Sequence, residues 1–478
     1  MNILFQEPFV DRRITFGKFE KGAGSNTFPY GVACIAAYMR DRGHKVHYLE
    51  PNLENISFSD YRQYLVSKNI ELAGIGSTTL QIGKTLKTFE KIKKINPKVI
   101  TVLGGIHGTI MPKETLKESG FVDYIVLGEG EKPFNNLVNF LEHKGKIKLK
   151  NINGIAYREK GKIIVNPPNF DDMLKPEEIP FPAYDLFPMN KYVAQITYAK
   201  TFPSYSLLCS RGCVFRCAFC NACDVFGGRV RYRPVDTVIE EILYLKQKYN
   251  AKGLFFQDST FTCNNQWVKE FCKKMIEKRI NIPWACGSRT DTVNEELLRL
   301  MKRAGCWEIS FGIESGNQKS LDLINKKTTV EQNTKILKLS MKTGIYTFAN
   351  YILCLPGETK EDVLNTIRYA KKMATPMALF YLPIPFPKTA LWDICKKKGI
   401  LRENAPWEEF NAWDISNPVY INPLIGKEEM KRLLNYAFTS YYRTPSVILK
   451  NLKEIILLRQ SIKRYWLALK GMLGLFRD

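Results

Sequence analysis

The chain contains few histidines and no long apolar segment. Its 478 residues include four histidines, all before residue 144. The second half of the chain therefore offers no imidazole, which excludes from it catalytic sites built around a histidine base. No window of roughly 18 uninterrupted apolar residues occurs, so no membrane-spanning helix is expected. The segment Met1–Glu7 also lacks the basic region and apolar run of a secretory signal. These absences predict a cytoplasmic protein.

Acidic residues are also scarce relative to basic ones. The chain has 47 Asp and Glu against 71 Lys and Arg, a formal charge of +24. Nucleic acid, anionic lipid and phosphorylated ligands all remain open as partners, although most of the excess is lysine spread over polar helix faces. Apolar residues make up 45% of the chain and charged residues 25%, which is typical of globular proteins. The length predicts two to four folded units.

Residues 1–140 alternate short apolar runs with amphipathic stretches. The expected strands are 3–5, 45–49, 72–76, 99–103 and 124–127, and the expected helices include 31–42 and 83–95. This β-α alternation predicts a doubly wound, Rossmann-like α/β domain with a parallel sheet. Glycines follow two of the strands, at Gly104, Gly105, Gly128 and Gly130. They are expected either to let a ligand approach the backbone or to form ordinary tight turns.

The rest of the chain divides into three parts. Residues 141–200 are expected to form a connector that contains a hairpin and is rich in proline. Residues 201–395 return to β/α alternation with six strand candidates, which predicts a complete or partial (β/α)6 barrel whose chemistry lies on the loops after the strands. Residues 396–478 lose the alternation and are expected to be helical.

Five cysteines follow the first barrel strand within 15 residues. They are Cys209, Cys213, Cys217, Cys220 and Cys223. Closely spaced thiolates bind zinc or iron–sulfur clusters. A structural zinc site usually needs a second pair of ligands, and no further Cys-x-x-Cys or Cys/His pair occurs in the chain.

Three of these cysteines carry a family resemblance. Cys213-x3-Cys217-x-Phe219-Cys220 resembles the motif of the radical S-adenosylmethionine enzymes. The resemblance implies that these three thiolates hold three irons of a [4Fe-4S] cluster, and that S-adenosyl-L-methionine chelates the fourth iron. Cys209 and Cys223 lie outside the motif and are expected either to be packing residues or to lie around the cluster without binding it.

Later segments match the same family in order, over roughly residues 204–392. The resemblance implies that Asp258 lies near the amino group of S-adenosylmethionine, although Gln257 stands where a second acid is usual. It places Ser288 and Arg289 near the carboxylate, Glu314 and Ser315 near the ribose, and Gly357 near the adenine. Cys354 stands where glycine is usual, and Lys388 also replaces a common glycine.

The first domain resembles the cobalamin-binding domain that precedes the barrel in one large subclass of this family. The matching segments are 29–31, 42–46, 102–109 and 126–131, with the last including Gly128 and Glu129. The chain lacks the Asp-x-His-x-x-Gly string of proteins that bind cobalt through histidine. We therefore expect cobalamin to have no histidine ligand and its nucleotide tail to lie near Gly104, Gly105 and His107.

Together the resemblances predict a cobalamin-dependent radical S-adenosylmethionine enzyme. The main hypothesis is methyl transfer to an unactivated carbon of a small-molecule or lipid substrate, through a 5′-deoxyadenosyl radical and methylcobalamin, with an external reductant of the flavodoxin or ferredoxin type. One alternative is a cyclase or rearrangement enzyme that uses cobalamin for electron transfer. A minor alternative is a basic iron–sulfur RNA-binding protein. It has no recognisable RNA-binding module, so no nucleic-acid partner is expected.

The last 36 residues leave two hypotheses open. Between Arg443 and Asp478, eight basic residues face two acidic ones, with leucines at roughly helical spacing. This composition suits a helix lying on an anionic membrane, which would make the protein peripherally membrane-associated. It also suits helices that cap the barrel and bury their leucines.

Overall fold

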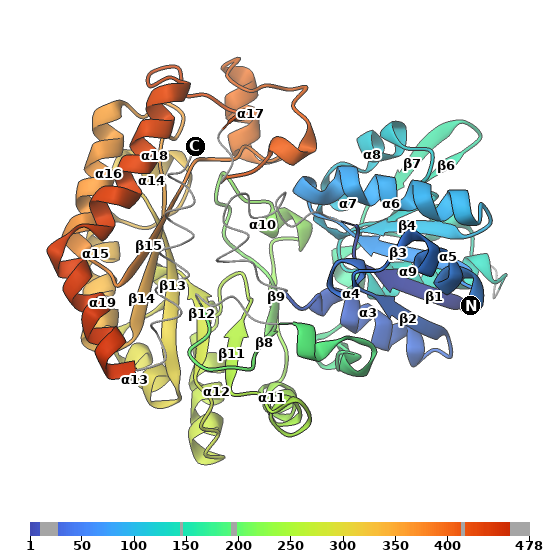
Figure 1. Ribbon diagram of the computed structural model, residues 1–478, viewed down its shortest axis with the longest axis horizontal. Helices are drawn as coiled ribbons and strands as arrows, with labels where there is room; N and C mark the ends of the chain where they lie inside the picture. Colours follow the sequence, from blue (N-terminus) through green and yellow to red (C-terminus); the bar gives the residue numbers. More distant parts are fainter. Residues whose placement is uncertain (10–26, 144–146, 193–197, 413–415, 459–478) are drawn as a thin grey trace.

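The computed structural model describes residues 1–9, 27–143, 147–192, 198–412 and 416–458. Two α/β units lie side by side, each built on its own sheet (Figure 1). The predicted fold class is confirmed, because an N-terminal doubly wound domain precedes a partial barrel.

The first sheet has seven strands in the order β2-β1-β3-β4-β5-β6-β7. They are β1 (Asn2–Gln6), β2 (Lys45–Leu49), β3 (Leu72–Gly76), β4 (Ile100–Gly104), β5 (Tyr124–Val126), β6 (Ile155–Glu159) and β7 (Lys162–Asn166). The first five pair in parallel. The order reverses between β1 and β3, and ligands of such sheets bind outside the carboxyl ends of the strands at that point.

Helices cover both faces of this sheet because its strands are apolar on both sides. Ile3 and Phe5 share a core with α3 (Tyr30–Arg40) and α9 (Glu131–Leu141). Leu4 points to the opposite face and packs with the second helical layer. That layer includes α5 (Phe58–Ser67), α6 (Ile82–Ile95) and α8 (Pro112–Glu118). The shorter helices are α4 (Pro51–Glu54) and α7 (Gly105–Ile110).

The hairpin expected in the connector is present, but it belongs to the first sheet. β6 pairs antiparallel with β5, and β7 pairs with β6. The sheet therefore continues past the expected boundary at residue 140 and ends at Asn166. Only the tertiary structure decides which sheet the hairpin joins, because the sequence of a hairpin does not indicate which strand will pair with it.

The second sheet has six parallel strands in the order β15-β14-β13-β12-β11-β8. They are β8 (Ser204–Leu207), β11 (Gly253–Phe256), β12 (Trp284–Ser288), β13 (Cys306–Glu314), β14 (Tyr346–Ile352) and β15 (Met377–Tyr381). β8 and β15 are the two edges, so the barrel is open. The six strands agree in number with the six candidates predicted for residues 201–395.

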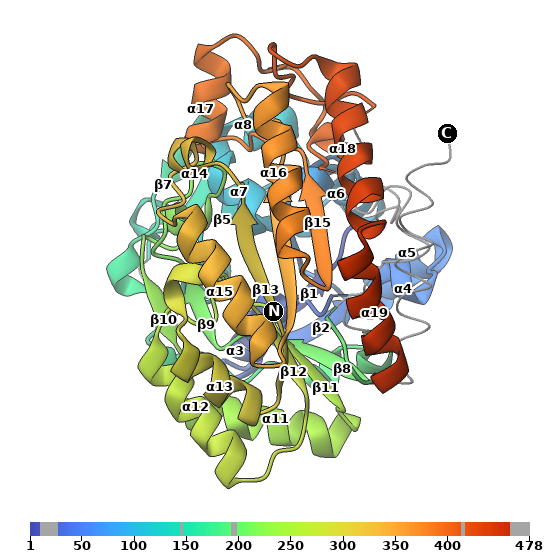
Figure 2. The same cartoon turned by 90° about the vertical axis from the view of Figure 1, so that its left-hand side faces the viewer.

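Helices cover the outside of this open barrel (Figure 2). They are α11 (Val235–Tyr249), α12 (Asn265–Glu277), α13 (Glu295–Arg303), α14 (Gln318–Leu323), α15 (Val330–Lys342) and α16 (Lys360–Met373). A two-stranded ribbon of β9 (Ser210–Gly212) and β10 (Val230–Tyr232) encloses the cysteine loop together with α10 (Ala222–Val225).

The C-terminal region is helical where described. α17 (Ala390–Lys397) follows the last strand, and α18 (Lys427–Tyr442) buries its apolar face against α16 and β15. α19 (Pro445–Leu458) continues the chain, and the remainder of the predicted amphipathic segment, 459–478, lies outside the described residues. None of the helices within the described ranges is long and apolar enough to cross a membrane.

A buried carboxylate joins the two units. Glu241 of α11 is fully buried and accepts hydrogen bonds from Tyr30 of α3 (3.1 Å) and Tyr184 of the connector (2.5 Å). Arg233 is 4% exposed at its side chain and forms an ion pair with the same carboxylate. First domain, connector and barrel therefore meet at one charged group.

We expect Glu241→Ala to destabilise the whole chain. The substitution leaves the guanidinium of Arg233 buried without its partner, which typically costs about 3–5 kcal/mol. Tyr184→Phe keeps the ion pair and removes one hydrogen bond to the carboxylate, which costs about 1.5–3 kcal/mol. Thermal unfolding followed by circular dichroism compares the two, and equal midpoints for both variants would contradict this role.

Candidate functional site

The cysteine loop lies at the carboxyl ends of the barrel strands and faces the first domain (Figure 1). Eight of the 12 cysteines are buried, whereas Cys213, Cys217, Cys220 and Cys263 are half-buried. Two of the motif sulfurs accept hydrogen bonds, from Ala222 N to Cys220 Sγ (3.4 Å) and from Arg289 Nη1 to Cys217 Sγ (3.4 Å). N–H donors aimed at sulfur suit thiolates, so this donor set fits a cluster held by the three motif cysteines.

The two cysteines outside the motif are buried, as expected of packing residues. Cys209 is fully buried and Cys223 is 2% exposed. Within the described ranges, no three Cys, His, Asp or Glu side chains form a group that could hold a single metal ion.

Asp258 lies directly beneath the cysteine loop. Its carboxylate accepts hydrogen bonds from the backbone N of Cys209 (3.1 Å) and from the backbone N and hydroxyl of Ser210 (both 2.5 Å). The side chain is 5% exposed, and burial raises its pKa to about 6 despite these hydrogen bonds. The structure thus places Asp258 against the backbone that leads into the motif.

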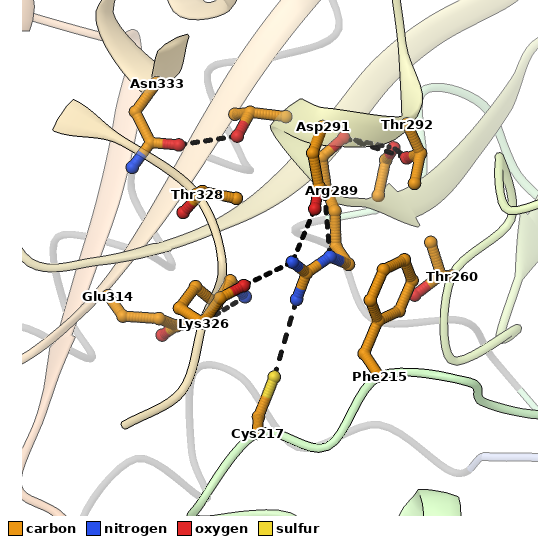
Figure 3. Close-up of polar contacts among 12 residues, drawn as sticks. Phe215, Cys217, Thr260, Arg289, Asp291, Thr292, Glu314, Lys326, Thr328 and Asn333 are labelled. Atoms are coloured by element: carbon orange, nitrogen blue, oxygen red, sulfur yellow. Dashed lines mark hydrogen bonds and ion pairs between the residues drawn. The ribbon is translucent and has the colours of Figure 1, made fainter. Parts of the chain in front are cut away.

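Arg289 is held by four hydrogen bonds (Figure 3). It donates from Nε and Nη2 to both oxygens of Asp291 (2.8 and 2.7 Å), and from Nη2 to the carbonyl of Lys326 (2.5 Å). Its Cζ lies 3.8 Å from the ring centroid of Phe215, within cation–π distance. The remaining edge of the guanidinium faces Cys217.

The predicted ribose-side residues form internal pairs. Glu314 accepts from Lys326 Nζ at 2.8 Å, and both side chains are under one-tenth exposed. Ser315 is fully buried and shares a hydrogen bond with Thr366 Oγ1 (3.0 Å). Lys326 lies far from the motif in sequence, and no pattern around it indicates a functional role. The sequence analysis therefore did not identify it.

Ser288 points into the barrel wall. Its hydroxyl shares a hydrogen bond with Thr262 Oγ1 (2.5 Å) and is 6% exposed. Arg289 follows directly in sequence, so this hydrogen bond at the end of β12 fixes the position of the Arg289 backbone.

The expected adenine loop is held by the C-terminal region. Tyr420 donates to the carbonyl of Cys354 (3.0 Å), and Asn422 donates to the carbonyls of Leu355 and Glu358 (2.8 and 2.9 Å). Cys354 adopts a φ of 66° and Gly357 a φ of 88°. A positive φ at residue 354 explains why glycine is usual there, because this region of φ is strained for other residues.

A cavity of about 260 Å³ lies at the carboxyl edge of the first sheet, at its switch point. Its lining is mainly apolar side chains and glycines, and it includes Gly104, Gly105, Gly128 and Glu129. Leu208, Arg211 and Phe226 close it from the side of the cysteine loop. An apolar, glycine-lined crevice at this position fits the cobalamin expected from the sequence.

His107 lies close to this cavity in sequence but does not line it. The imidazole is fully buried, its Nδ1 lies 3.3 Å from Thr79 Oγ1, and its ring packs edge-on against Trp407 at 4.9 Å between centroids. Burial lowers the pKa of His107 to about 4. His107 therefore packs against the C-terminal region, through Trp407.

Glu129 also forms a contact between the two units. It pairs with Arg211 (3.1 Å) and with Arg231, and Arg211 reaches Glu131 as well (2.7 Å). All four side chains are at most 16% exposed. Arg211 sits two residues before Cys213, so this buried network ties the cavity wall to the cysteine loop.

We expect Asp258→Ala to lower the iron content of the protein. Losing the carboxylate leaves the N–H groups of the loop unpaired, at about 1–3 kcal/mol for each buried donor. Gln257→Ala is the matched control, and iron and sulfide analysis is the measurement. If the variant keeps the wild-type iron content but binds S-adenosylmethionine more weakly, Asp258 instead serves to bind S-adenosylmethionine.

We expect Gly104→Leu to weaken cobalamin binding without unfolding the domain. Gly104 has a φ of −124°, and a Cβ there would meet no atom within 4 Å, so a side chain can leave the backbone at this position without a clash. Filling that space costs the ligand about 1–3 kcal/mol, or roughly five- to 150-fold in affinity.

The control for this substitution is Gly120→Leu. Gly120 is exposed, lies outside the cavity and is equally open around its Cβ. Titration of the two variants with cobalamin, followed by absorbance, compares their dissociation constants. Equal affinities would place cobalamin elsewhere.

Comparison with known proteins agrees with both halves of this geometry. The model of the Radical SAM superfamily matches residues 207–370, and that of the B12 binding domain matches residues 22–138. TsrM, a radical S-adenosylmethionine methyltransferase from Kitasatospora setae solved with cobalamin and a [4Fe-4S] cluster bound, shares the fold with a TM-score of 0.72. It is 16% identical, over 92% of this chain and 88% of that chain.

Two relatives are more similar in sequence. A protein of Pyrococcus horikoshii named as an uncharacterized methyltransferase is 33% identical over 92% of this chain and 93% of its own length. The anaerobic magnesium-protoporphyrin IX monomethyl ester cyclase of Rubrivivax gelatinosus is 30% identical over 87% of this chain and 73% of its own length. The chain therefore belongs to the cobalamin-dependent radical S-adenosylmethionine enzymes.

Proposed function

We propose that the protein is a methyltransferase that acts at an unactivated carbon of a small-molecule substrate. The observation that carries the proposal is the shared wall between the two sites. Leu208 and Arg211, at the start of the cysteine loop, also line the cavity of the first domain. A substrate carbon that lies between the cluster site and the cobalamin cavity would be within reach of both cofactors.

The cofactors supply the difficult chemistry when bound: hydrogen abstraction from carbon, and a transferable methyl group. The chain's own residues hold and orient them. Cys213, Cys217 and Cys220 would hold the cluster, and the glycine-lined cavity would hold cobalamin. The buried network around Glu129 keeps water out of the junction between the two sites, since its members are at most 16% exposed.

S-adenosylmethionine would lie at the carboxyl end of the barrel beside the open face of the cluster. We place its ribose near Glu314 and Ser315 and its adenine near Gly357. The open surroundings of Gly357, where a Cβ would meet nothing within 4 Å, support this placement. Ser288 would then act indirectly, because its hydrogen bond to Thr262 fixes the end of β12.

A cyclase that uses the same cofactors for electron transfer is the second candidate. It is favoured by the relative of Rubrivivax gelatinosus, which is named a cyclase and is 30% identical. Methyl transfer should yield both 5′-deoxyadenosine and S-adenosylhomocysteine, whereas the cyclase should yield 5′-deoxyadenosine alone.

The electron for this chemistry would come from an external protein of the flavodoxin or ferredoxin type. Membrane contact through α19 would bring the enzyme to a lipid substrate. Its side chains Ile448, Leu449 and Leu452 are 43%, 66% and 46% exposed, which supports an apolar surface facing outwards.

We expect anaerobic incubation with S-adenosylmethionine, cobalamin and reductant to release 5′-deoxyadenosine, even slowly without substrate. Cys217→Ala should abolish this release because the cluster loses a ligand, and Cys223→Ala should retain it. Chromatography of the nucleosides gives the result. Substrate methylation without 5′-deoxyadenosine would refute the proposal.

We expect the double variant Leu449→Glu, Leu452→Glu to bind anionic vesicles about tenfold less tightly or worse. Each buried leucine contributes roughly 1.5–3 kcal/mol, and the added charges oppose insertion. Val66→Glu, at a side chain 65% exposed on α5, is the control. Vesicle flotation in which the double variant still binds like wild type would remove the membrane proposal.

A further inference from the structure

The guanidinium of Arg289 makes four hydrogen bonds within the protein, which the family resemblance does not imply. Asp291 and the Lys326 carbonyl take three of its five N–H groups, and Cys217 Sγ takes a fourth. The fork to Asp291 holds the far edge of the group, and the ring of Phe215 supports its face. The Nη1 edge is thereby held toward the sulfur.

We propose that Arg289 sets the reduction potential of the cluster, through its N–H···S hydrogen bond to Cys217 and its positive charge. This inference rests on the proposed function, because it takes Cys217 as a ligand of the cluster. It differs from the expectation that Arg289 mainly binds the carboxylate of S-adenosylmethionine.

The direction of the effect follows from charge. A cluster that accepts one electron becomes more negative, and hydrogen bonds to its sulfurs, net charge and solvent exposure set its potential. A donor and a positive charge beside one thiolate stabilise the reduced form and so raise the potential. Arg289 is 5% exposed, so water and salt screen this interaction little. The enzyme would then be easier to reduce for a one-electron donor protein.

The surroundings of Cys217 support the same direction. Arg289 Nη1 lies 3.4 Å from Cys217 Sγ and donates to it. Asp291 neutralises part of the arginine's charge from the far side, but the N–H dipole that faces the sulfur remains. Arg289 is therefore the group that places a hydrogen atom on Cys217.

The test is a redox titration of the reconstituted full chain, followed by electron paramagnetic resonance, with no S-adenosylmethionine present. Leaving out that ligand removes any contribution from its binding. We expect Arg289→Met to lower the midpoint potential by about 59 mV or more, which is a tenfold change in the constant for one-electron reduction. Arg289→Lys keeps the charge but loses the fork, so its potential should lie between those of Met and wild type.

Arg216→Gln is the matched control. Arg216 precedes Cys217 in the chain, but its side chain is 70% exposed and pairs with Asp224 on the surface. Its removal changes the net charge of the same loop by the same amount, so an unchanged potential would show that position, not total charge, matters. A shift as large as that of Arg289→Met would overturn the proposal.

Partial loss of the cluster does not prevent the measurement, because a midpoint potential does not depend on occupancy. If neither Arg289 variant holds any cluster, the arginine is structural and the proposal fails. An unchanged potential with a tenfold weaker binding of S-adenosylmethionine would return Arg289 to the carboxylate. Failure of the proposed function would appear differently, as a wild-type protein that holds no cluster.

Discussion

The buried ion pairs between the cysteine loop and the first domain are the constraint on which the site depends. Arg211 pairs with Glu129 and Glu131, which belong to the loop after β5 and the start of α9. Breaking one such pair leaves a charge buried without a partner, so the two units cannot slide past each other without a large cost. These ion pairs therefore help to fix the distance between the two cofactor sites.

A second connection runs through the C-terminal region, which the sequence treats as a separate helical part. Tyr420 and Asn422 hold the loop 354–358 of the barrel. In the same segment Trp407 packs on His107 and donates to Glu118 of the first domain (3.2 Å). One stretch of chain thus touches both units near their carboxyl edges, and it links the expected adenine loop to the wall behind the cobalamin cavity.

Sequence patterns were most informative where the chemistry is carried by neighbours in sequence. The Cys213, Cys217 and Cys220 spacing identified the family, and the glycines after β4 and β5 line a real cavity. Such patterns were less informative for side chains whose role depends on partners. His107 is a buried contact of Trp407 and does not line the cavity, whereas Glu129 lines the cavity and also pairs with Arg211 and Arg231. Their partners, Trp407 and Arg211, have no pattern in the sequence that points to them.

The sequence by itself determined the strands of the two large sheets, the order of the two α/β units, the cysteine motif and the family, because alternation and short spacings are properties of a few adjacent residues. Tertiary structure alone decided that the hairpin joins the first sheet and that Arg289 turns its N–H toward Cys217, 72 residues away. Such contacts depend on which strands and loops come together. That is settled by the burial of the whole chain, and no local pattern records it.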